Sequence, residues 1–231
     1  MVGQISSDEM KKMAAETAVS QFVKDGMVVG LGTGSTASFA IKKIGQLVAE
    51  GWDIIGIPTS VASEELAKKV GIRVSTLDEH PRLDVTIDGA DEVDPGLNLI
   101  KGLGGALLRE KIVAESTEKE IIVVDESKLV GILGTKAPLP VEVVQYGAGR
   151  CKHLLSELGC IPEFRLRDGK HYVTDNNNFI LDCRFNGIRT PSETNRAIKN
   201  VTGVVDNGLF IGLVHAVVIA GAQGTRIRIS P

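Results

Sequence analysis

The apolar residues in the first half of the chain follow two patterns that alternate along the sequence. Short apolar runs, typical of buried strands, are each followed by a segment with apolar residues at helical spacing. The runs predict strands at 27–32, 53–58, 72–77, 83–88 and 120–125, and the spaced segments predict helices at 7–24, 35–51, 60–71 and 105–117, the first capped by Ser7. This alternation predicts an α/β fold, a Rossmann-like, doubly wound and mostly parallel sheet with helices on both faces. Every element up to residue 125, including the short segment 97–102, is assigned to this unit.

The pattern changes near Pro138 and Pro140. The following segments predict a strand at 141–144, a helix at 148–159, a strand at 163–167, a hairpin at 171–185 turning at Asn176–Asn178, a helix at 191–203 and a strand within 204–212. This β-α-β-β-α-β order predicts a second, smaller α+β domain of the ferredoxin-like type. Residues 215–221 and 225–230 are expected to return to the first sheet. The predicted domains are therefore 1–133 plus 206–231, which is catalytic, and 134–205, which serves oligomerisation.

Composition narrows the class of protein. The chain has 231 residues, with 29 acidic and 26 basic side chains, and its net charge of -3 argues against a nucleic-acid partner. No apolar stretch is long enough to cross a bilayer, and the polar N-terminus predicts no secretory signal. The three cysteines form no CxxC pair and the four histidines are scattered, which predicts a reducing cytoplasm and no zinc site.

A glycine-rich loop, Gly30–Ala37, lies between a predicted strand and a predicted helix. Its glycines allow a tight turn, the helix start offers free N–H groups, and Ser35 and Thr36 add hydroxyl donors. The loop therefore predicts an anion site, most simply for a phosphate. It is not a Walker A loop, because no Gly-Lys-Ser/Thr follows. The second strand ends in Thr59-Ser60 rather than in the acid that binds the ribose of NAD, which favours a small phosphorylated ligand.

An acidic cluster follows the strand 83–88 and contains Asp88, Asp91, Glu92 and Asp94. Ligands bind at the carboxyl ends of strands in open α/β sheets, and neighbouring carboxylates repel one another unless something positive or hydroxylic meets them. Three interpretations stay open for this cluster. It can hold sugar hydroxyls and exchange protons with them, it can bind magnesium, or it can be a solvated acidic turn.

A third cluster spans 101–111, where Lys101 precedes a glycine-rich turn and a helix. Backbone N–H groups of such a turn, aided by a lysine, can face a developing oxyanion. Glu110 lies in the first turns of the helix and has two interpretations. If it is buried, it suits removal of a proton beside a carbonyl, whereas the surrounding REK run is a common pattern of exposed charges.

Taken in order, the motifs GTGSTA (32–37), DGADE (88–92) and KGLGGALLREK (101–111) resemble the type A ribose-5-phosphate isomerase family. The segments DESK (125–128) and LPVEV (139–143) are similar too, and the resemblance covers the whole chain. It implies an aldose-ketose isomerase that interconverts D-ribose 5-phosphate and D-ribulose 5-phosphate in the non-oxidative pentose phosphate pathway. It further implies a cis-enediolate intermediate, no metal and no cofactor, and a homodimer or homotetramer.

The resemblance also implies roles for individual residues. Glu110 would be the base, Asp88 and Asp91 would hold the sugar and assist ring opening, and Lys101 would stabilise charge. The substrate would be bound by Thr33, Gly34, Ser35, Thr36, Asp88, Asp91, Lys101, Gly102, Gly104 and Lys128, with Lys11 a looser match. Two residues depart from the family. Some members have glycine at the position of Leu103 and a hydroxyl residue at the position of Leu108. Leu103 implies a tighter loop than glycine would.

Other functions remain as alternatives. A sugar-phosphate-sensing domain would keep the phosphate loop but lack a catalytic acid, and the positions of Glu110 and Lys101 speak against it. An NAD-dependent oxidoreductase is disfavoured because no acidic residue directly follows the second predicted strand, where one would bind the ribose of NAD. The third alternative is an amino-sugar phosphate deaminase or a CoA transferase. The deaminase would be expected to use a catalytic histidine, and none of the three motifs contains a histidine. The expected partner is a small sugar phosphate, not a nucleic acid or a membrane.

Overall fold

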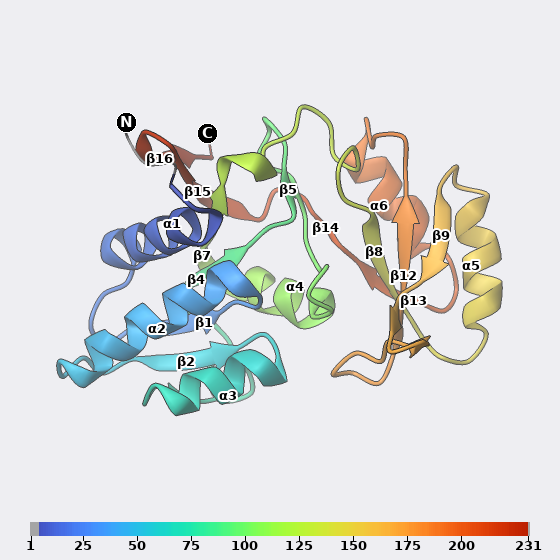
Figure 1. Cartoon of the computed structure of the whole chain (residues 1–231). Helices are drawn as coiled ribbons and strands as arrows, with labels where there is room; N and C mark the ends of the chain where they lie inside the picture. Colours follow the sequence, from blue (N-terminus) through green and yellow to red (C-terminus); the bar gives the residue numbers. More distant parts are fainter. Residues whose placement is uncertain (1–4, 231) are drawn as a thin grey trace. The chain divides into compact units, whose positions relative to one another are not determined.

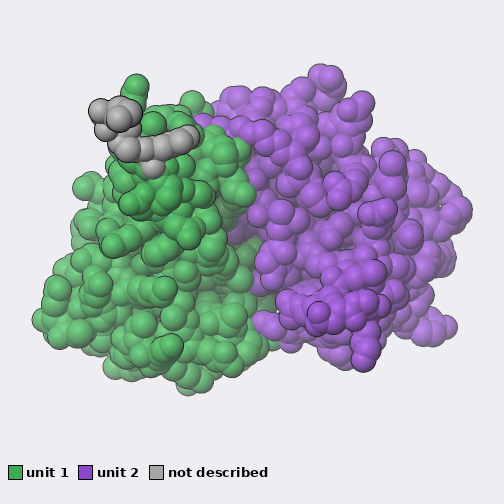
Figure 2. Space-filling view, in the orientation of Figure 1, with its two compact units in different colours: residues 1–90, 109–128, 213–231 green, residues 91–108, 129–212 purple. Residues whose placement is uncertain are grey.

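The computed structural model describes residues 5–230, which form two compact units. Unit 1 comprises Met1–Ala90, Arg109–Lys128 and Leu213–Pro231, and unit 2 comprises Asp91–Leu108 and Leu129–Gly212 (Figure 2). The domain boundaries expected from sequence, 1–133 plus 206–231 and 134–205, stay a prediction, and their end residues 1–4 and 231 lie outside the described part. The compact units group 91–108 with 129–212.

Unit 1 is built on a seven-stranded sheet with the order β16-β15-β7-β4-β1-β2-β3 (Figure 1). Its strands are β1 (Val28–Leu31), β2 (Ile55–Pro58), β3 (Arg73–Val74), β4 (Leu83–Gly89), β7 (Thr117–Asp125), β15 (Val214–Gly221) and β16 (Gly224–Ile229). All neighbours pair in parallel except β16, which is antiparallel to β15. The predicted return of the C-terminal strands to this sheet is confirmed.

Helices cover both faces of this sheet, as predicted. The helices are α1 (Ser7–Phe22), α2 (Ser35–Ala49), α3 (Val61–Lys69) and α4 (Leu107–Glu115), with a 3-10 turn at Glu126–Lys128. On one face, Ala18 of α1 and Ile44 of α2 belong to one buried cluster with Ile87 of β4. On the other face, Val113 of α4 packs with Ile57 in a separate cluster. The predicted cap Ser7 is wrong, because Ser6 caps α1: its hydroxyl accepts from Glu9 N and the Glu9 carboxylate accepts from Ser6 N.

Unit 2 contains a four-stranded antiparallel sheet with the order β13-β8-β12-β9. Its elements are β8 (Leu139–Val143), α5 (Ala148–Ser156), β9 (Ile161–Phe164), β12 (Phe179–Arg184), α6 (Pro191–Lys199) and β13 (Val204–Asn207). Taken along the chain, they give the predicted β-α-β-β-α-β order of a ferredoxin-like domain. A two-stranded sheet joins β10 (Leu166–Arg167) to β11 (Lys170–His171), and a three-stranded sheet joins β14 (Leu209–Phe210), β6 (Leu99–Ile100) and β5 (Glu92–Val93).

One prediction about these strands was wrong, and another is confirmed only close to its turn. Segment 97–102 does not join the doubly wound sheet, because Leu99 and Ile100 pair with residues 209–210 of β14, far away in sequence. Residues 171–185 do form the predicted turn, in which Thr174 N donates to Asn178 O at 2.9 Å. An isolated antiparallel bridge also joins Val173 to Phe179 across this turn. The hairpin extends no further, because β12 pairs with β8 and β9, and His171 pairs with Leu166.

Two further findings concern membrane-spanning helices and the state of the cysteines. None of the helices in the described residues is both long and apolar enough to span a membrane. Cys151, Cys160 and Cys183 are buried free thiols. Burial raises the pKa of the Cys151 thiol, so this side chain is protonated and packs as a small apolar group.

Candidate active site

The glycine-rich loop connects β1 to α2 and leaves the start of that helix open. Gly34 occupies the N-cap position with φ +100, a left-handed conformation that favours glycine, and no side chain caps the helix. The first N–H groups of α2 therefore lack side-chain acceptors, and the helix dipole adds a partial positive charge beside the exposed Ser35. The predicted anion-binding loop thus has the backbone geometry that such a site requires.

Thr33 is held by hydroxyls from the next strand-to-helix connection. Its Oγ1 lies 2.7 Å from Thr59 Oγ1 and donates to Ser60 Oγ at 2.8 Å. Ser60 in turn caps α3, so the starts of α2 and α3 are tied together. A pocket of about 290 Å³ opens here, lined by Gly32, Thr33, Gly34, Ser35, Ser38, Ile41, Ala62, Ser63 and Leu66.

Asp88 supports the same loop from β4. It is 1 % exposed, and its Oδ1 accepts hydrogen bonds from Thr33 N at 3.0 Å and Gly89 N at 2.7 Å. A Cβ on Gly32 would lie 2.3 Å from that oxygen, so only glycine permits this close approach. The structure therefore brings the phosphate loop and the first predicted catalytic carboxylate into direct contact.

Glu110 is a buried residue of α4, only 4 % exposed, so the interpretation as a surface charge in an REK run is wrong. Its neighbour Lys111 is 5 % exposed. The helix is short and its other face carries exposed residues such as Ile112 and Glu115, so the local charge pattern did not reveal which face is buried. Its burial matches the interpretation in which this carboxylate removes a proton beside a carbonyl.

The two remaining predicted lysines of unit 1 lie in partly exposed positions. Lys128 ends the 3-10 turn that follows β7, at the carboxyl edge of the sheet. Lys11, the looser match, lies on α1 and forms an ion pair with Asp8 at 3.0 Å. Both side chains can reach solvent and are therefore available to an anionic ligand.

The acidic cluster resolves into carboxylates with different partners. Glu92 is fully buried, and its oxygens accept backbone N–H bonds from Gly134 at 2.5 Å, Lys136 at 2.6 Å and Ala137 at 2.7 Å. Asp94 accepts from Asn98 N at 2.8 Å and so closes the turn between β5 and β6. These two residues are structural, which leaves Asp88 and Asp91 as the candidates for sugar contacts. Among the described residues, no group of three or more His, Cys, Asp or Glu side chains is arranged to hold a metal ion.

In unit 2 the glycine turn follows a buried lysine. Lys101 is 2 % exposed, its N–H donates to Gly208 O at 2.9 Å, and its Nζ lies 5.4 Å from the centroid of the Phe210 ring. Gly102 has φ +101, and Gly105 N donates to Gly102 O at 3.0 Å, which closes a tight turn with Gly104 exposed at its tip. Asp91 Oδ2 accepts from Leu103 N at 3.0 Å, so this carboxylate is tied to the turn.

Comparison with known proteins identifies the family of the chain. The sequence profile of the family described as "Ribose 5-phosphate isomerase A (phosphoriboisomerase A)" matches residues 55–224. The chain is 51% identical to the ribose-5-phosphate isomerase A of Desulfatibacillum aliphaticivorans over 96% of this chain and 97% of that protein. It is 49% identical to the "Probable ribose-5-phosphate isomerase 3, chloroplastic" of Arabidopsis thaliana over 96% of this chain and 84% of that protein. The chain belongs to the ribose 5-phosphate isomerase A family.

Solved structures of the family share the whole fold. A D-ribose-5-phosphate isomerase solved in complex with phospho-erythronic acid superposes with a TM-score of 0.94 at 39% identity, covering 97% of this chain and 99% of that chain. The enzyme of Methanocaldococcus jannaschii gives a TM-score of 0.92 at 41% identity, covering 97% and 100%. The resemblance read from the motifs is therefore confirmed, and so is the fold class.

Sequence reasoning missed the residues that support the site. Thr59 and Ser60 entered only as an argument against NAD, yet their hydroxyls hold Thr33. A pair of hydroxyl residues directly after the second strand was the available signal, because that strand is the neighbour of β1 in a doubly wound sheet.

Proposed function

We propose that this protein interconverts D-ribose 5-phosphate and D-ribulose 5-phosphate through a cis-enediolate, with Glu110 as the base. The observation that carries the proposal is the burial of Glu110 in a chain of this family. A carboxylate that is 4 % exposed is shielded from water, and a carboxylate is a suitable base for removing a proton beside a carbonyl.

The substrate phosphate is assigned to the start of α2. Thr33, Gly34, Ser35 and Thr36 supply backbone N–H groups and hydroxyls there, and the loop is prearranged by Asp88 and Thr59. A phosphate placed at a helix start is stabilised by the dipole and by several donors at once. Lys128, which is partly exposed, is assigned to the same ligand by its match to the family motif.

The chemistry follows from the assigned groups. Asp88 and Asp91 hold hydroxyls of the sugar and assist opening of its ring. Glu110 takes the proton from C2 of the aldose and returns it to C1, while a proton passes from O2 to O1, so the aldehyde becomes a ketone with no net gain of electrons. Lys101 and the backbone N–H groups of Gly102 and Gly104 stabilise the enediolate oxygen. The relative described above was solved with phospho-erythronic acid, whose carboxylate spreads negative charge over two oxygens as an enediolate does.

The test is conversion of ribose 5-phosphate to ribulose 5-phosphate by the purified chain, with and without EDTA, in the wild type and in Glu110→Gln. We expect turnover that EDTA does not change, and a loss of kcat of at least about a hundredfold in Glu110→Gln with substrate still bound. Glu115→Gln is the matched control, because Glu115 is an exposed glutamate on the same helix. Retained turnover in Glu110→Gln would remove Glu110 from the base role, and no turnover in the wild type would reject the function.

We also propose a homodimer or homotetramer in the cytoplasm. Unit 2 exposes large apolar side chains, among them Tyr146 at 95%, Ile161 at 66% and Leu166 at 58%, which supports an oligomer contact in the predicted small domain. The buried free thiols suit a reducing compartment. Light scattering at several protein concentrations tests the assembly, and a monomer throughout would contradict it.

A further inference from the structure

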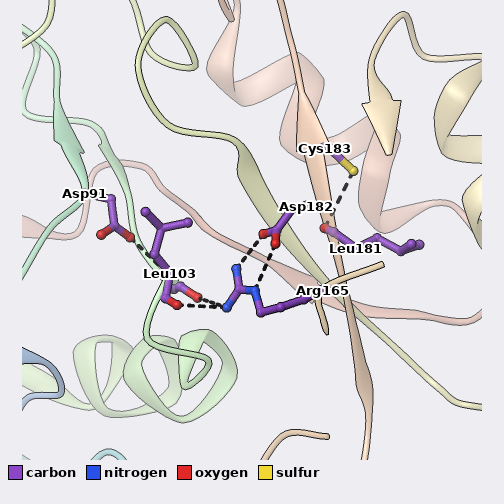
Figure 3. A network of polar contacts seen from close by, with 7 residues as sticks. Asp91, Leu103, Arg165, Leu181, Asp182 and Cys183 are labelled. Atoms are coloured by element: carbon purple, nitrogen blue, oxygen red, sulfur yellow. Dashed lines mark hydrogen bonds and ion pairs between the residues drawn. The ribbon is translucent and has the colours of Figure 1, made fainter. Parts of the chain in front are cut away.

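Arg165 lies between β9 and β10 and reaches the glycine turn of the same unit (Figure 3). Its Nη1 donates to Gly102 O at 3.0 Å and to Leu103 O at 2.9 Å. Its Nε donates to Asp182 Oδ2 at 2.9 Å, and its Nη2 donates to Asp182 Oδ1. One guanidinium therefore joins a carboxylate of β12 to two successive carbonyls of the turn.

This pairing is well shielded and stereochemically specific. The side chains of Arg165 and Asp182 are 13% and 22% exposed. The Arg165 guanidinium also lies 6.0 Å from the centroid of the Tyr172 ring. A planar guanidinium with its fork on a carboxylate is fixed in direction as well as in position, which a lysine ammonium cannot reproduce.

The two carbonyls that bind Arg165 determine where the following N–H groups point. In a planar trans peptide the N–H points opposite to the C=O. The Gly102 carbonyl shares its peptide with the Leu103 N–H, which donates to Asp91 Oδ2 at 3.0 Å on the other side. The Leu103 carbonyl shares its peptide with the Gly104 N–H, which is therefore directed away from Arg165.

The Gly104 N–H is thus presented as a donor at the exposed tip of the turn. Within residues 5–230, no hydrogen-bond acceptor is found for it, and Gly104 is exposed. The turn depends on its glycines, since Gly102 and Gly105 have φ of +101 and +89 and a Cβ on Gly105 would lie 2.2 Å from the Tyr172 hydroxyl.

We propose that Arg165, oriented by Asp182, is a positioning residue that aims the Gly104 N–H and the Asp91 carboxylate at the substrate. The inference rests on the proposed isomerase function. Arg165 acts through the backbone of the turn and touches no reacting atom. Asp182, Arg165, the Gly102–Leu103 peptide and Asp91 form one hydrogen-bonded chain, so loss of the guanidinium loosens the turn that presents the Gly104 N–H and that is bonded to Asp91.

The experiment compares Arg165→Met, Arg165→Lys and Asp182→Asn with Arg184→Met. Arg184 is an exposed arginine on the same strand as Asp182 and serves as the matched control. Steady-state kinetics with ribose 5-phosphate are measured, together with hydrogen exchange of the peptide covering 101–106. We expect kcat to fall by about a hundredfold in Arg165→Met with KM within about threefold, because the phosphate loop is untouched. Exchange at 103–105 should rise, while Arg184→Met should match the wild type in both.

Arg165→Lys separates geometry from charge. Lysine keeps the positive charge but lacks the fork, so we expect kcat to stay near that of Arg165→Met; recovery to within about twofold of the wild type would overturn the argument from directed hydrogen bonds. If Arg165→Met fails to fold, Asp182→Asn keeps the guanidinium and should show a smaller loss of kcat with raised exchange. An active wild type with unchanged kcat in both Arg165 variants would overturn the inference alone. An inactive wild type would reject the isomerase function instead. In that case, hydrogen exchange at 103–105 that is unchanged in the Arg165 variants would reject the positioning role independently.

Discussion

Asp88 Oδ1 accepts a hydrogen bond from the backbone N–H of Thr33 at 3.0 Å, although the two residues are 55 positions apart in the chain. The same oxygen accepts from Gly89 N at 2.7 Å. One carboxylate oxygen therefore fixes the phosphate loop. A residue assigned to sugar chemistry thus also shapes the site for the phosphate, and these two duties can be separated by substitution.

Asp88→Asn should lower kcat while leaving KM nearly unchanged. An amide oxygen can still accept from Thr33 N and Gly89 N, so the loop keeps its shape, but an amide does not exchange protons with a hydroxyl. We expect kcat to fall by about a hundredfold or more, with KM within about threefold, in steady-state assays. Asp88→Ala is the comparison and should raise KM as well, because the loop loses its anchor. Equal KM values in the two variants would contradict the anchoring role.

Gly105→Ala should damage the glycine turn. Gly105 has φ +89, and its Cβ would lie 2.2 Å from the Tyr172 hydroxyl, so alanine is both strained and crowded. The strain alone is about 1–2 kcal/mol, and the clash adds to it. We expect a lower free energy of unfolding in urea and a lower kcat. Gly131→Ala, where a Cβ meets no atom within 4 Å, is the control and should change neither.

Much of the fold was predictable because its signals are local. The strands of the parallel sheet are buried on both faces and read as continuous apolar runs, for example Ile121–Val124, so they are visible without knowledge of their partners. The phosphate loop is similarly local, because its turn, its helix start and its hydroxyls are neighbours in sequence. The three-stranded sheet was missed because β5 and β6 are only two residues long each, and because β14 pairs with β6 across more than a hundred positions of the chain, Leu209 with Ile100.

The site was less predictable where tertiary contacts decide a residue's role. Glu110 and Glu92 are both glutamates in charged segments, and only the structure shows that both are buried. Glu92 differs from Glu110 in its role, because its carboxylate accepts backbone hydrogen bonds from Gly134, Lys136 and Ala137, some forty residues away, and is therefore structural. Arg165 directly follows β9 and Asp182 lies on β12, and the pairing of these two strands brings the side chains together. No motif in either segment indicates a link to the glycine turn.

The start of α1 should make a pH-dependent contribution to stability. Hydrogen bonds from the backbone N–H and the hydroxyl of Ser6 lower the pKa of Glu9. A carboxyl with a lowered pKa stabilises the fold above its unfolded pKa, and this contribution is lost as pH falls through the lowered value. We therefore expect Ser6→Ala to be less stable than the wild type at neutral pH, with the difference shrinking in acid. Thermal melts from pH 7 to about pH 3 measure it, and a difference that grows in acid would contradict the assignment.

Glu92→Gln should destabilise the protein without acting on the chemistry. The carboxylate of Glu92 is fully buried and accepts three backbone N–H bonds, from Gly134 on one oxygen and from Lys136 and Ala137 on the other. An amide can accept on only one side, and its NH₂ group then meets an N–H donor on the other. We expect a loss of about 2–3 kcal/mol in the free energy of unfolding, measured by urea denaturation, with kcat near the wild-type value at temperatures where the variant is folded. Glu118→Gln, at an exposed glutamate, should change stability by less than about 0.5 kcal/mol. A stable Glu92→Gln variant with a large loss of kcat would instead move Glu92 from the structural carboxylates to the sugar contacts.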